Sequence, residues 1–216
     1  MEQNAYLTLR RPATDRFTEK KSEFIGYAAP LTTEEEAAEF LRSVRAAHGD
    51  ARHCVYAYIL RQDHLSRFSD DGEPQGTAGM PTLDVLRKTG LTDCGVAVVR
   101  YFGGILLGTG GLVRAYTHAA RLAVTAAEIV ERREFDELFV RIGYPAYQRL
   151  PAELQRYSIL TDETSFSDTV LLRLAVPCEN TAAFLEKLTD LSGGSAAVER
   201  LGKRFDFSKS SVSAAE

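Results

Sequence analysis

The sequence predicts an α+β protein of two domains. Strand-like and helix-like segments alternate through the first part of its 216 residues, around a β-branched run that ends in a glycine-rich loop. After a charged stretch at 128–136 the pattern restarts as strand, helix, strand, strand, helix, strand. That order is typical of a ferredoxin-like βαββαβ domain, an antiparallel sheet with both helices on one face. We therefore predict domains at 1–133 and 134–207, followed by a disordered tail at 208–216.

The composition is that of an ordinary globular protein and excludes several classes. Charged residues make up 26% of the chain, but the net charge is only −4, so any RNA-binding surface must be local. No apolar run is long enough for a signal peptide or a membrane span, which predicts a cytoplasmic protein without membrane contact. Three widely spaced cysteines, Cys54, Cys94 and Cys178, indicate buried reduced thiols rather than disulfides or a zinc site.

The first domain opens with clear strand and helix signals. Residues 14–31 mix alternating and apolar stretches and predict one strand or a hairpin. A capping box that begins at Thr33 opens an amphipathic helix, and Gly49 ends it. Residues 53–60 form a β-rich run, and we expect its neighbour in the sheet to be the run at 95–102.

A long loop at 61–82 separates those two strands. Its centre at 70–74 has turn chemistry, and the residues at 76–79 lead into a short helix that reaches about Thr89. We expect Thr77 to cap this helix. The first domain therefore contains two helix starts lined by glycine, one here and one in the next segment.

The stretch at 96–116 reads as strand, glycine loop and helix, VAVVRYFGGILLGTGGLVRAY. Glycines allow positive φ angles or close approach to a ligand, and the first amides of a helix have no partner within the helix. Flanking arginines complete the ingredients of a phosphate or carboxylate site. The residues that we predict to bind an anion or RNA are Arg100, Gly103, Gly104, Gly108, Gly110, Gly111, Arg114, Gly76, Thr77 and Gly79.

The glycine pattern matches no nucleotide-binding motif. A P-loop requires Gly-Lys-Ser or Gly-Lys-Thr after the glycines, and neither follows here. The stretch also does not match the GxGxxG pattern of a dinucleotide-binding unit, in which an acidic residue closes the next strand. The alternative is that the glycines only permit a tight turn and close helix–sheet contact, and the residues leave both interpretations open. Alternation places Arg100 on the same face as Val98 and Phe102. If that face is buried, Arg100 must be paired, which favours a structural role.

Six further residues accompany this site: His53, Asp70, Asp71, Glu73, His118 and Arg121. The three carboxylates offer oxygen ligands for a divalent ion, but their spacing fits no calcium loop; a solvated turn or caps for helix amides are the alternatives. His53 has no nucleophile with an orienting acid, which favours a structural or RNA-contacting role over general-base catalysis. The stripe of Arg114, His118 and Arg121 either follows a phosphate backbone or is simply solvated. We predict no catalytic residue, cofactor or metal ion.

The second domain repeats the change of period from strand to helix. The expected elements are strands at 135–144, 158–166, 169–177 and 197–205, with helices at about 145–157 and 181–191. Pro151 is expected to break or kink the first helix, and Gly193 with Gly194 ends the second. The strands carry no basic and aromatic signature of an RNA-recognition motif, so they give no support for base stacking in this domain.

Several long motifs resemble those of the IMPACT/YigZ family. They are VVRYFGG at 98–104 followed by LGTGGLVRAY at 107–116, KKSEFI at 20–25, His53 with YAY at 56–58, and SDDGEP at 69–74 followed by GTAGMP at 76–81. The resemblance covers the whole first domain, and the remainder resembles the smaller second domain of the bacterial members. One departure is Cys54, where the family usually has Asn.

The resemblance implies a fold and a broad function. It implies that the first domain has the fold of domain IV of elongation factor G, with a left-handed βαβ crossover, and that the second resembles domain V. In eukaryotic relatives the domain accompanies a module that binds the activator of a translation-regulating kinase. We therefore predict a non-enzymatic, translation-associated regulator that binds RNA or the ribosome through the glycine-rich site. The alternatives are a small-molecule enzyme or phosphate-ester-binding protein using the same loop, and a module for a protein partner in translation control.

Overall fold

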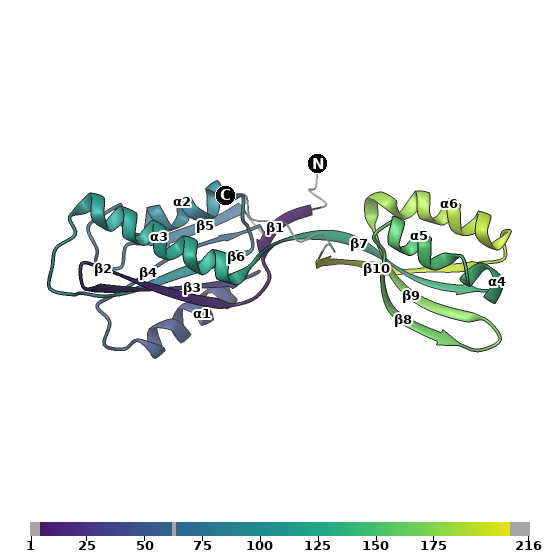
Figure 1. The fold of residues 1–216 in the computed structure, drawn as a ribbon, viewed down its shortest axis with the longest axis horizontal. Helices are drawn as coiled ribbons and strands as arrows, with labels where there is room; N and C mark the ends of the chain where they lie inside the picture. Colours follow the sequence, from purple (N-terminus) through teal and green to yellow (C-terminus); the bar gives the residue numbers. More distant parts are fainter. Residues whose placement is uncertain (1–4, 62–63, 208–216) are drawn as a thin grey trace. The chain divides into compact units, whose positions relative to one another are not determined.

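The computed structural model describes residues 5–61 and 64–207. Within them the chain forms two compact units that divide between Val130 and Glu131. Each unit combines strands and helices, which confirms the predicted α+β protein of two domains (Figure 1). The expected tail at 208–216 lies outside the described residues.

The first unit is built on an antiparallel sheet with strand order β2-β3-β6-β4-β5. Its elements are β1 (Ala5–Leu9), β2 (Ala13–Glu19), β3 (Ser22–Pro30), α1 (Glu34–Ala47), β4 (His53–Leu60), β5 (Leu65–Ser69), α2 (Gly79–Lys88), β6 (Cys94–Tyr101) and α3 (Thr109–Ala127). The residues at 14–31 form the β2–β3 hairpin, and β4 pairs with β6 as expected. Strand β5 was missed, because it lies inside the segment predicted to be a long loop.

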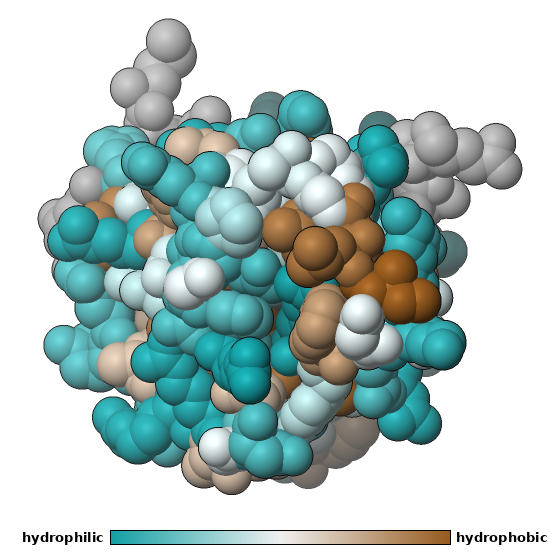
Figure 2. Space-filling view, turned by 90° about the vertical axis from the view of Figure 1, so that its left-hand side faces the viewer, coloured by the Kyte–Doolittle hydropathy of each residue, from teal (hydrophilic) through white to brown (hydrophobic). Residues whose placement is uncertain are grey.

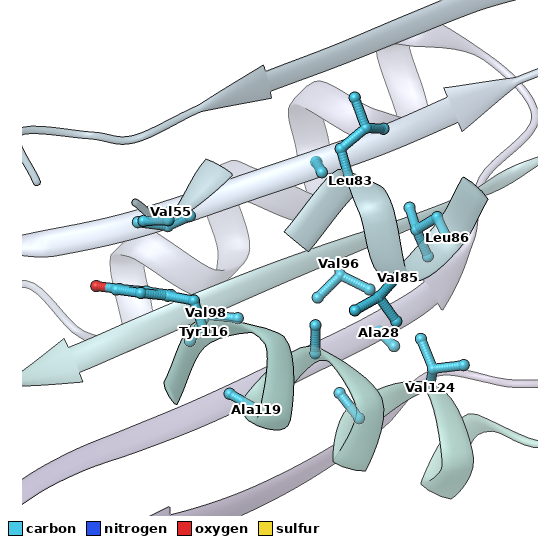
Figure 3. Packing of buried hydrophobic residues seen from close by; sticks show 14 of the residues in the cluster. Ala28, Val55, Leu83, Val85, Leu86, Val96, Val98, Tyr116, Ala119 and Val124 are labelled. Carbon is cyan, nitrogen blue, oxygen red and sulfur yellow. The ribbon is translucent and has the colours of Figure 1, made fainter. Parts of the chain in front are cut away.

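Helices cover both faces of this sheet. Val96 and Val98 point toward the cluster formed with α2 and α3, whereas Ala97 and Val99 pack with Val44 of α1 on the other face. Figure 3 shows the first cluster, in which Tyr116 of α3 approaches the sheet. Since β6 is buried on both faces, its sequence is a continuous apolar run that ends at Arg100.

The strand pairing requires an unusual crossover in this unit. The segment β3-α1-β4 connects two parallel strands across β6, and β5-α2-β6 connects two parallel strands across β4 in the opposite direction. The two crossovers start from antiparallel strands, β3 and β5, and move across the sheet in opposite directions. These two reversals cancel, so the crossovers have the same hand only if their helices lie on the same face of the sheet. Because α1 and α2 lie on opposite faces, one of the two crossovers must be left-handed, as the family resemblance implied. The likeness to elongation factor G itself stays a prediction.

The second unit has the strand order expected of a ferredoxin-like domain. Its elements are β7 (Ile129–Ile142), α4 (Tyr144–Tyr147), α5 (Leu150–Arg156), β8 (Leu160–Phe166), β9 (Val170–Pro177), the short 3-10 helix η2 (Cys178–Asn180), α6 (Thr181–Ser192) and β10 (Ala197–Phe207). The four strands pair antiparallel in the order β10-β7-β9-β8. The apolar faces of α5 and α6 pack on the buried residues of β7 and β9.

Two details of the second unit differ from the sequence-based expectations. Strand β7 starts at Ile129, so the charged stretch is part of the strand, where Glu131 and Glu179 both pair with Arg133. The single helix expected at 145–157 is two short helices, and Pro151 lies in the first turn of the second. A proline is tolerated there because that turn needs no intrahelical donor. No helix in the described part of the chain is long and apolar enough to cross a membrane.

An ion pair in this unit predicts how its stability depends on pH. Arg204 donates two hydrogen bonds of 2.7 and 2.8 Å to the carboxylate of Asp162, and these bonds lower the pKa of that carboxyl. The pair therefore stabilises the fold at pH above the unfolded value of about 4, and this contribution is lost as the pH falls through the lowered folded pKa. We expect Asp162→Asn to lower the free energy of unfolding by about 1 kcal/mol at neutral pH, and to leave it unchanged at a pH well below both the folded and the unfolded pKa of Asp162. Urea unfolding across this pH range measures the effect, with Glu163→Gln on the same strand as the control; an equal cost at all pH values would contradict it.

Candidate functional site

The segments that carry the sequence motifs meet at one end of the first sheet. Glu23 at the start of β3 lies opposite Tyr101 at the end of β6, and His53 at the start of β4 lies opposite Arg100. Ser69 at the end of β5 pairs with Tyr56 of β4, close to the same end of the sheet. The β2–β3 turn, the β5–α2 loop and the β6–α3 loop therefore lie at this end, which is on the left in Figure 1. Residues that are far apart in the sequence thus form one surface.

The first glycine-lined helix start is already capped by the chain itself. One carboxylate oxygen of Asp70 accepts the amides of Ala78 at 3.0 Å and Gly79 at 2.8 Å, and the other accepts the amide of Gly76 at 2.8 Å. The expectation that Thr77 caps α2 is wrong, because its hydroxyl donates to the Pro74 carbonyl at 2.7 Å. Capping by a carboxylate was the alternative left open, and Asp70 fulfils it.

Asp71 and His53 hold the rest of this loop in place. Asp71 accepts a hydrogen bond of 3.0 Å from Arg45 and one of 2.7 Å from the backbone amide of Cys54. His53 Nδ1 lies 2.8 Å from the Asp71 carbonyl oxygen. A carbonyl only accepts, so Nδ1 carries the hydrogen. His53 is thus oriented by a neutral backbone group, which fits the predicted structural role better than general-base catalysis.

Arg100 is buried beneath these loops and paired. Its side chain is 7% exposed, and Nη1 donates to Glu73 Oε1 at 2.7 Å. The hydroxyl of Tyr116 donates to the same oxygen at 2.7 Å, and burial raises the pKa of Tyr116 far above its usual value. The guanidinium also lies over the rings of Phe24 and Phe102, 5.5 and 5.4 Å from their centroids. This is the paired arrangement that the alternation of β6 required if its face was buried.

Two glycines of the β6–α3 loop serve close packing. A side chain on Gly103 would overlap the backbone carbonyl of Lys21, and the Gly103 amide donates to the hydroxyl of buried Ser22 at 3.1 Å. Leu107 packs against the core and lies over Gly111, where an added Cβ would come within 2.9 Å of its Cβ. These contacts support the packing interpretation for Gly103 and Gly111.

The second glycine-lined helix start is different, because no side-chain hydrogen bond caps it. Helix α3 begins after Gly108, which has a φ of 73°, and its first turn contains no acidic residue. Gly104, with a φ of 82°, lies in open space, and Gly110 is exposed. A cavity of about 260 Å³ beside this turn is lined by Phe17, Glu19, Lys20, Leu107, Gly111, Arg114, Ala115 and His118. A shallower hollow along the helix includes Arg114, His118 and Arg121.

This surface has the chemistry of an anion site. The amides at the start of a helix carry a partial positive charge, and exposed Arg114, His118 and Lys20 lie beside them. Among the described residues, no group of three His, Cys, Asp or Glu side chains is arranged to hold a metal ion. The carboxylates of Asp70, Asp71 and Glu73 are engaged by the amides and cations described above.

Two bacterial proteins resemble this chain over most of their length. IMPACT family member YvyE of Bacillus subtilis is 35% identical over 192 residues, which are 88% of each chain. IMPACT family member YigZ of Escherichia coli is 40% identical over 179 residues, covering 82% of this chain and 88% of YigZ. The chain belongs to the IMPACT family.

Domain models and a solved structure agree with membership of the IMPACT family. The Impact N-terminal domain model matches residues 20–124, which contain every site residue predicted from the sequence, and a domain of unknown function, DUF1949, matches residues 140–195. The crystal structure of a hypothetical protein is 37% identical in sequence and has a TM-score of 0.59, covering 91% of this chain and 97% of that one. The resemblance inferred from the motifs is therefore confirmed.

The departure from the IMPACT pattern at Cys54 leaves the site intact. The contact of this residue with Asp71 uses its backbone amide, which any residue supplies. Its thiol lies in the cluster with Val44 and Val99 on the α1 face, and burial raises the pKa of the thiol. Cys94 is also buried, whereas Cys178 is half-buried, and all three cysteines are free. The hydrogen bond from residue 54 to Asp71 in the acidic loop therefore does not depend on the Asn side chain that the family usually has.

Sequence reasoning missed a chain of polar side chains on the α1 face of this IMPACT domain. The Tyr101 hydroxyl donates its one hydrogen to Asp50 at 2.9 Å, so it can only accept from His48 Nδ1, 2.8 Å away. The other ring nitrogen, Nε2, then accepts a hydrogen bond of 2.6 Å from the Tyr27 hydroxyl. The signal in the sequence was weak: Tyr27 and Tyr101 lie on strands that are mostly apolar. It also missed Ser22, whose role follows from the register of β3 and β6.

Proposed function

We propose that this protein is a translation-associated regulator that binds RNA or the ribosome in the cytoplasm through the amino-terminal end of α3. The single observation that carries the proposal is the uncapped first turn of α3 beside exposed Lys20, Arg114 and His118. Membership of the IMPACT family supports the association with translation. The local character of this basic surface fits a chain whose net charge is negative.

The predicted site residues take different parts in this proposal. Gly104, Gly108 and Gly110 have no side chains that would block the first turn of α3. Arg114 and Arg121 contact the phosphates of the bound RNA. A second group supports this surface from below or behind: Arg100, Gly103, Gly111, Gly76, Thr77, Gly79, His53, Asp70, Asp71 and Glu73. Most of them are held by hydrogen bonds or close contacts within the chain, and Gly111 packs under Leu107, so we assign this group to the shape of the site.

Removing a phosphate contact is expected to change the salt dependence of binding. We expect the wild-type protein to co-sediment with ribosomes and to retain RNA on filters more strongly at low salt. Arg114→Gln and Arg121→Gln should each lower the slope of log affinity against log salt by roughly 0.7 to 0.9. Arg42→Gln on α1 is the control, because Arg42 is exposed and pairs with Glu39 away from this surface. Absent or salt-insensitive association of the wild-type protein would contradict the proposal.

The cavity beside α3 favours one alternative, a protein that binds a small phosphate ester. A volume of about 260 Å³ approaches the lower limit for a small-molecule pocket, so a phosphate ester is the second candidate ligand. A thermal-shift screen with nucleotides and phosphorylated metabolites tests it, since a ligand at about 100 times its dissociation constant stabilises a protein by roughly 2.7 kcal/mol. A shift from a small ligand together with absent RNA binding would favour this alternative.

A further inference from the structure

The β6–α3 loop displays apolar side chains at the end of the domain that carries the candidate site. Phe102 is 50% exposed, and Leu106 is 82% exposed with Ile105 beside it in the sequence. Figure 2, which faces this end, shows apolar surface gathered in one place among hydrophilic surroundings. Gly103 and Leu107 fix the loop to the β2–β3 turn and to the core. The loop is therefore anchored at both ends, and it keeps these apolar side chains exposed to solvent.

The ring of Phe102 is supported from within the protein. The guanidinium of Arg100 lies over the ring, 5.4 Å from its centroid, and Arg100 is itself buried and held by Glu73. One face of the ring is therefore covered from the protein side by a fixed cation, and half of the residue remains in solvent. A rigid aromatic ring with one free face is the arrangement on which nucleic-acid bases stack.

Further cations belong to the turn that packs against the loop of Phe102. Gly103 packs directly against the backbone of Lys21, which brings the turn of Lys20 and Lys21 beside Phe102. Both lysines have positive φ angles, 46° and 66°. Glycine or asparagine adopts these angles at lower cost, so the turn by itself does not explain two lysines. Arg114 lines the same cavity as Lys20 and adds a third positive charge, against the single carboxylate of Glu19 in that lining.

We propose that Phe102 is a stacking platform for an unpaired RNA base, so that the ligand is RNA with single-stranded or unpaired nucleotides. This inference rests on the proposed function and names its ligand class. Lys20, Lys21 and Arg114 bind the phosphates on either side, and the apolar loop excludes water from the stacked base. Bases within a duplex are already stacked on each other and present no free face to a protein ring. Duplex RNA is therefore bound through phosphates alone.

The absence of tryptophan from the chain allows a direct test. Phe102→Trp places the only tryptophan of the chain at the platform, and a stacked base quenches its fluorescence. We expect a single-stranded adenine ribo-oligonucleotide to quench this fluorescence and a duplex of the same length to leave it unchanged. Phe166→Trp is the matched control, because Phe166 is 59% exposed and lies in the second domain; neither RNA should quench it.

Affinity measurements complete the test. Phe102→Leu should weaken single-strand binding about tenfold, within the range known for loss of one stacked base, and leave duplex binding unchanged. Equal binding of both RNAs without quenching at position 102 would overturn the inference and leave the proposed function standing. Unchanged single-strand affinity in Phe102→Leu would also overturn it and point to a protein pocket as the occupant of the apolar loop. Failure of the wild-type protein to bind either RNA and to co-sediment with ribosomes would instead refute the proposed function.

Discussion

Replacing Arg100 with methionine is expected to destabilise the first domain by about 3–5 kcal/mol, the usual cost of breaking a buried ion pair from one side. The substitution keeps the length of the side chain but leaves the carboxylate of Glu73 buried with only the hydroxyl of Tyr116 as a hydrogen-bond partner. It also removes the cation that lies over Phe24 and Phe102. Urea unfolding followed by circular dichroism measures the loss as a lower midpoint.

Two further variants separate the ion pair from general effects of substitution. Arg121→Met on the exposed face of α3 is the matched control and should change stability by less than about 0.5 kcal/mol. Adding Glu73→Leu to Arg100→Met removes both charges and should restore part of the stability, because no buried charge then remains unpaired. A cost below about 1 kcal/mol for Arg100→Met alone would show that Arg100 and Glu73 are not paired and buried in solution.

Gly103→Ala should be as damaging as the loss of Arg100, although it adds only one methyl group. The new Cβ would overlap the backbone carbonyl of Lys21, and backbone atoms in a paired hairpin have little freedom to move. We expect a loss of about 3 kcal/mol, at the upper end of the usual cost of overpacking. The shift of the β2–β3 turn should also weaken RNA binding, because that turn carries Lys20 and Lys21.

The controls for Gly103→Ala are other glycines of the same domain. Gly49→Ala has open space around the new methyl group and should be nearly neutral. Gly104→Ala also meets no neighbour, but its φ of 82° adds strain of about 1–2 kcal/mol. The expected order of melting temperatures is therefore Gly49→Ala, then Gly104→Ala, then Gly103→Ala. A Gly103→Ala protein as stable as Gly49→Ala would contradict the close contact with Lys21.

Elements with strong periodicity were predicted well, and short or charged ones were not. The bounds of β4 agree with the expected strand at 53–60, and Thr33 caps α1 as its capping box indicated. Strand β5 was missed because its five residues are partly exposed and its pairing with β4 gives no clear alternation in the sequence. The start of β7 was missed for a related reason, since Arg133 is held in the strand by partners that include Glu179, far along the chain.

The candidate site shows the same division at the level of single residues. The motifs identified which loops belong to it, because glycines, turn residues and flanking arginines have recognisable local chemistry. They did not reveal that Asp70 occupies the amides before α2, or that Glu73 holds Arg100. Both contacts join residues of different elements, and their geometry depends on the register of β4, β5 and β6.

The sequence by itself determined the family, the α+β class and the two glycine-lined helix starts. These follow from local patterns, namely hydrophobic period, turn residues and long motifs. Only the tertiary structure decided which helix start is free: Asp70 caps α2, whereas α3 begins uncapped beside Lys20 and Arg114. The physical reason is that an amide is available to a ligand only if no other group of the folded chain reaches it, and the packing of distant segments decides which groups do.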